Sequence, residues 1–174
     1  MRGEETQIFG AMALDPRLAS GKHIVLLPGT HSKWVWLDDG AIVRFRTSMT
    51  GELYALLGQS SLLAAGEAGS NEGEGFAAGL LRAGQGAAPS VALFEARAAQ
   101  LLDGRTVDWA RGFVSGLLIG AEIAEMAPHD TVLAIGDPAL VVRYNEALAQ
   151  RGVQMRSMDG EACAIAGLRL LDDD

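Results

Sequence analysis

The sequence has 174 residues, of which 49% are hydrophobic and 21% charged, a composition typical of a single globular domain rather than of a disordered chain. Its net charge of −8 argues against a basic surface for nucleic acid, and its longest apolar stretch is too short to span a membrane. The three histidines and one cysteine show no metal-ligand spacing. A lone cysteine also excludes an internal disulfide and favours a reducing, cytoplasmic compartment.

The first third of the chain predicts a helix followed by a small antiparallel sheet. Apolar side chains recur at helical spacing from Glu4 to Leu14, and Pro16 marks the end of that helix. Strands are expected at residues 23–27, 34–37 and 42–47, with a hairpin turn at the Asp-Asp-Gly of residues 38–40. Because Arg44 and Arg46 alternate with apolar residues, the third strand is expected to be half-exposed.

The middle of the chain predicts helices. The first begins near Thr50 and closes at Gly58, and a Gly- and Glu-rich loop is expected at residues 66–75. Ser90 and Thr106 are suitable N-caps for two further helices, which end near residues 104 and 126. In the last helix, glycines recur at positions 112, 116 and 120. We expect this smooth stripe to let another helix or a sheet approach closely in a folded core.

The last third of the chain predicts a βαβα unit. Its elements are a strand at 131–135, a helix to about 150, a strand at 153–157 and a helix at 161–171. Gly136 leaves room at the carboxyl end of the first strand, where ligands of α/β sheets usually bind. Asp137 and Pro138 also suit the N-cap and first position of the helix, so structure alone can explain them.

The most informative segment is the turn between the first two strands, which reads PGTHSK at residues 28–33. Glycine lets the backbone approach an anion closely, and the N–H groups of a turn can converge on phosphate oxygens. Thr30, Ser32 and Lys33 add two hydroxyl groups and a positive charge. An ordinary hairpin with a polar turn in water explains these residues equally well, so the turn alone leaves both interpretations open.

Several separated segments resemble 2-dehydro-3-deoxygalactonokinases. They are residues 1–7 (MRGEETQ), residues 27–35 (LPGTHSKWV), residues 45–53 with the sequence MTGE at 49–52, and residues 115–122 (SGLLIGAE). Each is weak evidence alone, but they occur in the order of the family and the similarity runs through essentially the whole chain.

This resemblance implies an α/β fold, a ribonuclease H-like domain with a mixed sheet and flanking helices. Such domains occur in the actin, hexokinase and Hsp70-like ATPases, in which two of them clamp ATP and Mg²⁺. Residues 1–174 resemble only the C-terminal domain, because nothing in them matches the family's first phosphate hairpin. The N-terminal domain is therefore expected to be absent from this chain, which would supply half of an active site.

The resemblance also implies roles for individual residues. Gly3-Glu4 stands where related sugar kinases carry the catalytic base, so either Glu4 or the adjacent Glu5 is expected to accept the proton. Acids at a helix N-terminus are also common for structural reasons alone. The implied phosphate ligands are Gly29, Thr30, His31, Ser32 and Lys33. The implied nucleotide site contains Gly136, Asp137, Arg143 and Tyr144, and Arg2 is placed at the substrate carboxylate.

Together these assignments imply the ATP- and Mg²⁺-dependent phosphorylation of 2-dehydro-3-deoxy-D-galactonate to its 6-phosphate. The expected partners are this sugar acid and the nucleotide, without nucleic acid, a membrane or a metal held by the protein alone, and the fold is compatible with a homodimer. The alternative is a catalytically inert nucleotide-binding or interaction module, which the missing first phosphate hairpin supports.

Overall fold

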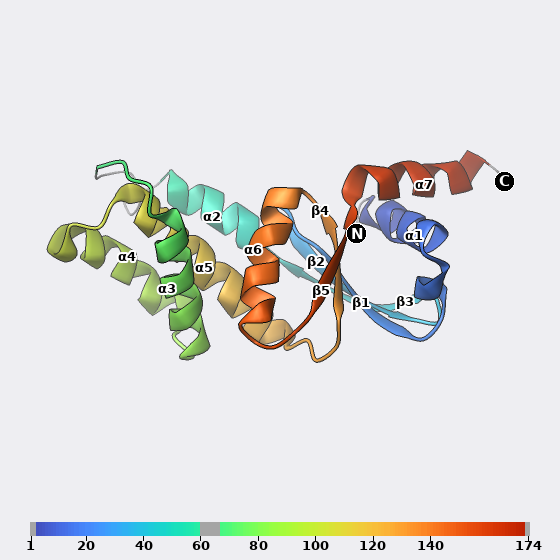
Figure 1. Cartoon of the computed structure of the whole chain (residues 1–174), viewed down its shortest axis with the longest axis horizontal. Helices are drawn as coiled ribbons and strands as arrows, with labels where there is room; N and C mark the ends of the chain where they lie inside the picture. The colour runs from blue at the N-terminus through green and yellow to red at the C-terminus, as the bar shows by residue number, and fades with distance from the viewer. Residues whose placement is uncertain (1–2, 60–66, 173–174) are drawn as a thin grey trace. The chain divides into compact units, whose positions relative to one another are not determined.

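The computed structural model describes residues 3–59 and 67–172, and the chain divides into two compact units (Figure 1). The first unit combines residues 1–48 with residues 128–174 and contains the sheet. The second unit comprises residues 49–127 and is helical. Arg2, which was predicted at the substrate carboxylate, lies outside the described residues. The assignment of residues 1–174 to one domain stays a prediction.

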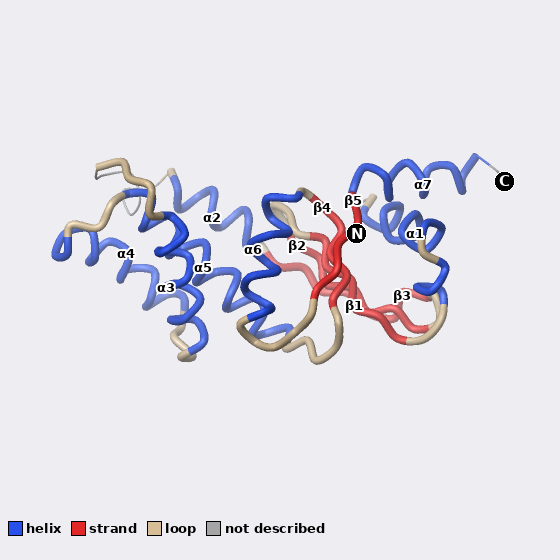
Figure 2. Tube along the Cα trace, in the orientation of Figure 1, coloured by secondary structure: helices blue, strands red, loops and turns tan. Residues whose placement is uncertain are grey.

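The first unit is built on a mixed five-stranded sheet of order β3-β2-β1-β4-β5 (Figure 2). Its strands are β1 (Lys22–Leu27), β2 (Ser32–Asp38), β3 (Ala41–Ser48), β4 (Val132–Gly136) and β5 (Met155–Asp159). The first three form antiparallel pairs, whereas β4 runs parallel to both β1 and β5. This arrangement confirms the predicted α/β fold with a mixed sheet.

Helices cover both faces of this sheet. In Figure 1, α1 (Glu4–Leu14) and α7 (Gly160–Asp172) lie on one side and α6 (Pro138–Ala149) on the other. Helix α1 packs into the main apolar core, which includes Ile8, Val25 and Val35. The two helices α1 and α7 approach so closely that a Cβ on Gly10 would lie 1.8 Å from the carbonyl oxygen of Cys163. This contact fixes α1 over the sheet and so determines where its first turn lies.

Three strands differ from the sequence prediction. β2 begins two residues earlier than predicted, at Ser32 instead of Trp34. β3 is an edge strand that is exposed along most of its length rather than on one face. Its partly buried Ile42 packs against the core under α1, but most of the strand extends past that core. β5 begins two residues later than predicted, at Met155 instead of Val153. The N–H of Val153 donates to the carbonyl of Leu148, so this residue belongs to the turn after α6. That turn contains Gly152 with a φ of 72°, in the left-handed region that glycine favours.

The second unit contains four helices among its described residues. They are α2 (Thr50–Gly58), α3 (Glu72–Gly84), α4 (Pro89–Asp103) and α5 (Val107–Met126). The glycine stripe of α5 packs on α3, where a Cβ on Gly112 or Gly116 would lie about 2 Å from a backbone oxygen of α3. This confirms the predicted close packing. None of the described helices is both long and apolar enough to cross a membrane.

The sequence prediction was wrong at two places in this unit. Helix α3 starts at Glu72, within the segment predicted to be a Gly- and Glu-rich loop, of which residue 66 lies outside the described residues. Ser90 is not the N-cap of α4, because Ala88 holds that position and Pro89 is the first helical residue. The predicted cap at Thr106 is confirmed, since its hydroxyl accepts the N–H of Trp109.

Candidate functional site

A pocket of about 300 Å³ lies in the first unit, at the carboxyl ends of β1 and β4. These strands are parallel neighbours, so they end at the same edge of the sheet, where α/β proteins commonly bind ligands. The lining comes from α1, from the β1–β2 hairpin and from the end of β4: Glu4, Gln7, Leu27, Pro28, Gly29, Thr30, His31, Lys33, Ile135 and Gly136. The fold thus brings together predicted residues from three distant parts of the chain.

The β1–β2 loop forms one wall of this pocket. Strand pairing extends to Leu27 and Lys33, and the loop between the two strands exposes Thr30 and His31. A Cβ added at Gly29 would meet no atom within 4 Å, so the backbone there has an open side that a ligand can approach. The loop therefore presents a glycine that is free of packing and an exposed hydroxyl beside it, two features that suit an anion-binding turn.

The two predicted acids lie in different environments. Helix α1 begins at Glu4, which lines the pocket and whose Oε1 is 3.1 Å from the Nζ of Lys33. Glu5 turns back toward the start of the helix, where its Oε2 accepts the N–H of Gly3 at 3.1 Å. Glu5 does not line the pocket. Of the pair, Glu4 is therefore the acid that a ligand in this pocket can reach.

Lys33 is held inside the protein. Its side chain is 9% exposed, and its Nζ donates to the carbonyl oxygen of His31 at 2.9 Å in addition to the ion pair with Glu4. The lysine therefore connects the start of α1 to the β1–β2 loop. The sequence predicted a lysine in the pocket, but did not predict that its charge would meet a carboxylate there.

Gln7 is a pocket residue that the sequence analysis missed. Its Nε2 donates to the carbonyl of Gly160 at 3.1 Å, which joins α1 to the start of α7. A Cβ on Gly160 would lie 3.3 Å from the Cα of Gly136, so the ends of β4 and β5 meet closely at this point. Gln7 follows Glu4 by three residues and so shares its helix face, a spacing that could have identified it.

Ser32 was predicted as a phosphate ligand, but the structure places it away from the pocket. Successive strand residues point to opposite faces of the sheet, so Ser32 and Lys33 diverge. The Ser32 hydroxyl is buried and lies 2.8 Å from the hydroxyl of Tyr144 on α6. Tyr144 itself is 2% exposed and does not line the pocket. This pair connects α6 to the opposite face of the sheet.

The predicted nucleotide residues are only partly brought together. Gly136 lines the pocket at the end of β4. Asp137 caps α6, because its Oδ1 accepts the N–H groups of Ala139 and Leu140, at 2.8 and 3.3 Å. Asp137 and Arg143 are both outside the pocket lining. The capping interpretation of Asp137, which the sequence left open, is the one that its contacts support.

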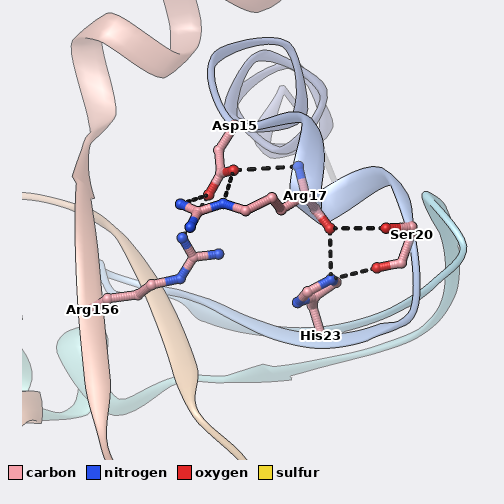
Figure 3. Close-up of polar contacts among 5 residues, drawn as sticks. All are labelled: Asp15, Arg17, Ser20, His23 and Arg156. Carbon is pink, nitrogen blue, oxygen red and sulfur yellow. Dashed lines mark hydrogen bonds and ion pairs between the residues drawn. The ribbon is translucent and has the colours of Figure 1, made fainter.

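A polar cluster holds the far end of α1 (Figure 3). Asp15 follows the helix and accepts from the Nε of Arg17 at 2.8 Å and from the Nη1 of Arg156, on β5, at 2.6 Å. Its side chain is 11% exposed, and the two guanidinium groups, Arg17 first, hold the pKa of the Asp15 carboxyl well below its ordinary value. Nearby, His23 donates from Nε2 to the carbonyl oxygens of Arg17 and Ser20. Both ends of α1 are thus tied to the sheet.

The described residues contain no group of three or more His, Cys, Asp and Glu side chains that could hold a metal ion. Magnesium at phosphoryl-transfer sites is usually bound by one or two carboxylates together with water and the phosphates of the substrate. One carboxylate lines the pocket, that of Glu4, and it is compatible with a magnesium ion held mainly by water and phosphate.

The chain resembles known proteins along almost its whole length. A model of the 2-keto-3-deoxy-galactonokinase family matches residues 1–171. The 2-dehydro-3-deoxygalactonokinase of Escherichia coli (strain K12) is 40% identical over an alignment of 174 positions, which covers 97% of this chain and 58% of that protein. A Rhizobium meliloti (strain 1021) protein, described as a candidate 2-dehydro-3-deoxygalactonokinase, is 39% identical over an alignment of 180 positions, which covers 97% of this chain and 57% of that protein.

A solved structure supports the same relationship. The crystal structure of a candidate 2-dehydro-3-deoxygalactonokinase from Sinorhizobium meliloti matches this fold with a TM-score of 0.86 at 39% sequence identity, and the match covers 99% of this chain and 58% of that one. The chain thus spans 57–58% of the length of these relatives. Because the family model matches nearly every residue, the chain belongs to the 2-keto-3-deoxy-galactonokinase family.

Proposed function

We propose that this chain carries the acid and one phosphate-binding loop of an ATP-dependent kinase that converts 2-dehydro-3-deoxy-D-galactonate into its 6-phosphate. Family membership and the names of the relatives support the reaction class. The observation that carries the proposal is the pocket itself, in which Glu4 lies with the open backbone of Gly29 and the exposed Thr30. Phosphoryl transfer needs a group that accepts a proton and a cradle for phosphate oxygens.

In this proposal Glu4 is the general base and Glu5 a structural residue. The terminal hydroxyl of the sugar acid gives its proton to the Glu4 carboxylate while its oxygen forms a bond to the γ-phosphorus. The bond between that phosphorus and the β–γ bridging oxygen breaks, and ADP leaves with the electron pair. Gly29, Thr30 and the exposed His31 contact the phosphate, and Gly136 lies on the nucleotide side of the pocket.

Magnesium would supply charge neutralisation at the transferred phosphate. The pocket fits an ion that is held mainly by nucleotide and water, with Glu4 as the nearby carboxylate. Asp137, Arg143 and Arg2 stay predicted contacts of the nucleotide and the sugar acid. A cytoplasmic location is part of this proposal, since the single thiol, Cys163, would stay reduced there, and burial raises its pKa.

The proposal is tested by coupled measurement of ADP release with 2-dehydro-3-deoxy-D-galactonate as substrate. The chain is assayed alone and mixed with the remaining portion of the Escherichia coli relative, because it spans 58% of that protein. Glu4→Gln should lower the turnover of the active preparation by about 10²–10⁴-fold, since the base is lost. Glu5→Gln is the matched control and should keep turnover near that of the unchanged chain.

The assay also separates the alternatives. Turnover that survives Glu4→Gln and disappears with Glu5→Gln would assign the base to Glu5. ATP binding without turnover in either preparation would favour the inert nucleotide-binding module. Turnover on an unrelated sugar acid but not on the galactonate derivative would keep the kinase and correct its substrate.

A further inference from the structure

Lys33 differs from an ordinary phosphate-binding lysine because its ammonium group already contacts a carboxylate and a backbone carbonyl of this chain. Its backbone lies within the sheet, paired with Leu27 on one side and Thr47 on the other. Its side chain is 9% exposed, and its Nζ lies 3.1 Å from Glu4 Oε1 and 2.9 Å from the carbonyl oxygen of His31. An ammonium group has three N–H donors, and two of them are directed to these oxygens.

These contacts neutralise the charge that a phosphate would need. The carboxylate of Glu4 is 27% exposed and the Lys33 side chain 9%, so the ion pair is partly shielded from water and its charges interact more strongly than on an open surface. For Lys33 to bind a phosphate with its full charge, it would have to give up its ion pair with Glu4. Separating a partly buried pair in this way costs free energy.

We propose that Lys33 is a positioning residue, which holds the Glu4 carboxylate in place and pins the β1–β2 loop through the carbonyl of His31. This inference rests on the proposed function, in which Glu4 is the base and the loop contacts the phosphate. The phosphate is then bound by the loop backbone and Thr30, and Lys33 acts on the reaction through the groups that it orients.

The two roles of Lys33 predict different affinities for Mg·ATP. If it is a positioning residue, Lys33→Met weakens binding because the Glu4 charge now faces the phosphates, and adding Glu4→Gln restores the affinity to within about threefold of the unchanged chain. If it is a direct phosphate ligand, the double variant stays as weak as Lys33→Met. Calorimetric titration of the unchanged chain, Glu4→Gln, Lys33→Met and the double variant distinguishes the two outcomes, and the second would overturn the proposal.

A double-mutant cycle on folding tests the same contact without any nucleotide. The folding equilibrium constants of the unchanged chain, Glu4→Gln, Lys33→Met and the double variant are measured by urea denaturation. If the two residues are coupled, the fold-decrease in the folding equilibrium constant of the double variant should be at least about fivefold smaller than the product of the fold-decreases in the two single variants. Independent effects, whose losses simply multiply, would overturn the proposal even if the chain is a kinase.

The effect on the loop is read from amide hydrogen exchange at residues 29–32. Lys33→Met should accelerate this exchange, and Lys33→Arg, which keeps the positive charge, should bring it back toward the unchanged rate. Lys22→Met is the control, because it removes the only other lysine, an exposed residue at the start of β1. Loop exchange that is the same in all four chains would contradict the pinning of the loop. If no chain binds Mg·ATP, the proposed function fails while the cycle and the exchange still decide the role of Lys33.

Discussion

Gly29 is a pocket residue that can take a larger side chain without a steric clash. A Cβ there meets nothing within 4 Å, and the backbone of Gly29 is outside the left-handed region. We expect Gly29→Ala to leave the thermal midpoint nearly unchanged but to weaken Mg·ATP binding about tenfold, since the methyl group occupies the space that a phosphate would approach. Thermal denaturation and calorimetric titration of the same preparation check the two parts.

Gly58→Ala provides the control for this substitution. Gly58 ends α2 in the second unit, and a Cβ there also meets nothing within 4 Å. It should leave nucleotide affinity unchanged. Equal affinity of the Gly29→Ala and unchanged chains would remove the loop from the proposed phosphate site.

For individual residues, the sequence predicted which residue types form the pocket better than it predicted where their side chains point. Gly29, Thr30 and Lys33 were found from the composition of one turn, and they do line one pocket. The divergence of Ser32 from Lys33 follows from strand alternation, but the sequence did not show that β2 begins at Ser32 itself. The difference between Glu4 and Glu5 depends on Lys33 and on the N–H of Gly3, which is a matter of three-dimensional contact.

Among the elements, the contact of α3 with α5 depends on glycines in both helices. A Cβ on Gly79 would lie 2.1 Å from the carbonyl oxygen of Phe113, so the helices must separate to admit it. We expect Gly79→Ala to lower the free energy of unfolding by about 1–3 kcal/mol. Urea denaturation measures this loss.

Gly73→Ala tests whether that loss comes from the contact. Gly73 lies on the same helix, and a Cβ there meets nothing within 4 Å. This variant should be as stable as the unchanged chain or more stable by up to about 1 kcal/mol, because alanine favours the helix. A similar loss at both positions would show that the loss does not come from the contact with α5.

The link between the end of α1 and β5 should give the protein a dependence on pH. Arg17 and Arg156 lower the pKa of Asp15 in the folded chain from its ordinary value of 3.8. The carboxylate therefore stabilises the fold fully above that value, and the contribution is lost as the pH falls through the lowered pKa. Asp15→Asn should lower the thermal midpoint at about pH 7, and the difference from the unchanged chain should shrink in acid.

Thermal scans of both chains from neutral to acid pH measure this difference. Asp103→Asn serves as a control at an exposed aspartate that ends α4. A gap between Asp15→Asn and the unchanged chain that stays constant in acid would mean that Asp15 contributes through packing rather than through its charge.

Elements with strong local signals were predicted well, and those defined by tertiary contact were not. The bounds of α1 were predicted in full, since apolar spacing and Pro16 mark them in the sequence. Helix α3 was missed because Gly75 and Gly79 weaken its local helix signal. At both positions a Cβ would collide with the backbone of α5, so the close packing of the two helices requires glycine there. The start of β5 was misplaced because Val153 has a strand-like side chain but a backbone held in the preceding turn.

For the whole molecule, every residue that lines the pocket belongs to the first of the two units. Parallel pairing of β1 with β4 places the hairpin loop beside Gly136, and the packing of α1 on α7 places Glu4 opposite them. The topology could be predicted from the family resemblance together with the alternation of strands and helices. The pairing of Glu4 with Lys33 could not, because the two residues lie on different elements and nothing local links them.

The central claim, that this pocket binds the phosphates of a nucleotide, is tested most directly by titrating Mg·ATP into the isotopically labelled chain and following its backbone amide resonances. The account predicts saturable shifts centred on residues 29–33 and on Gly136, with smaller shifts at the start of α1. Saturable shifts confined to other parts of the chain, or no saturable shift at all, would contradict it.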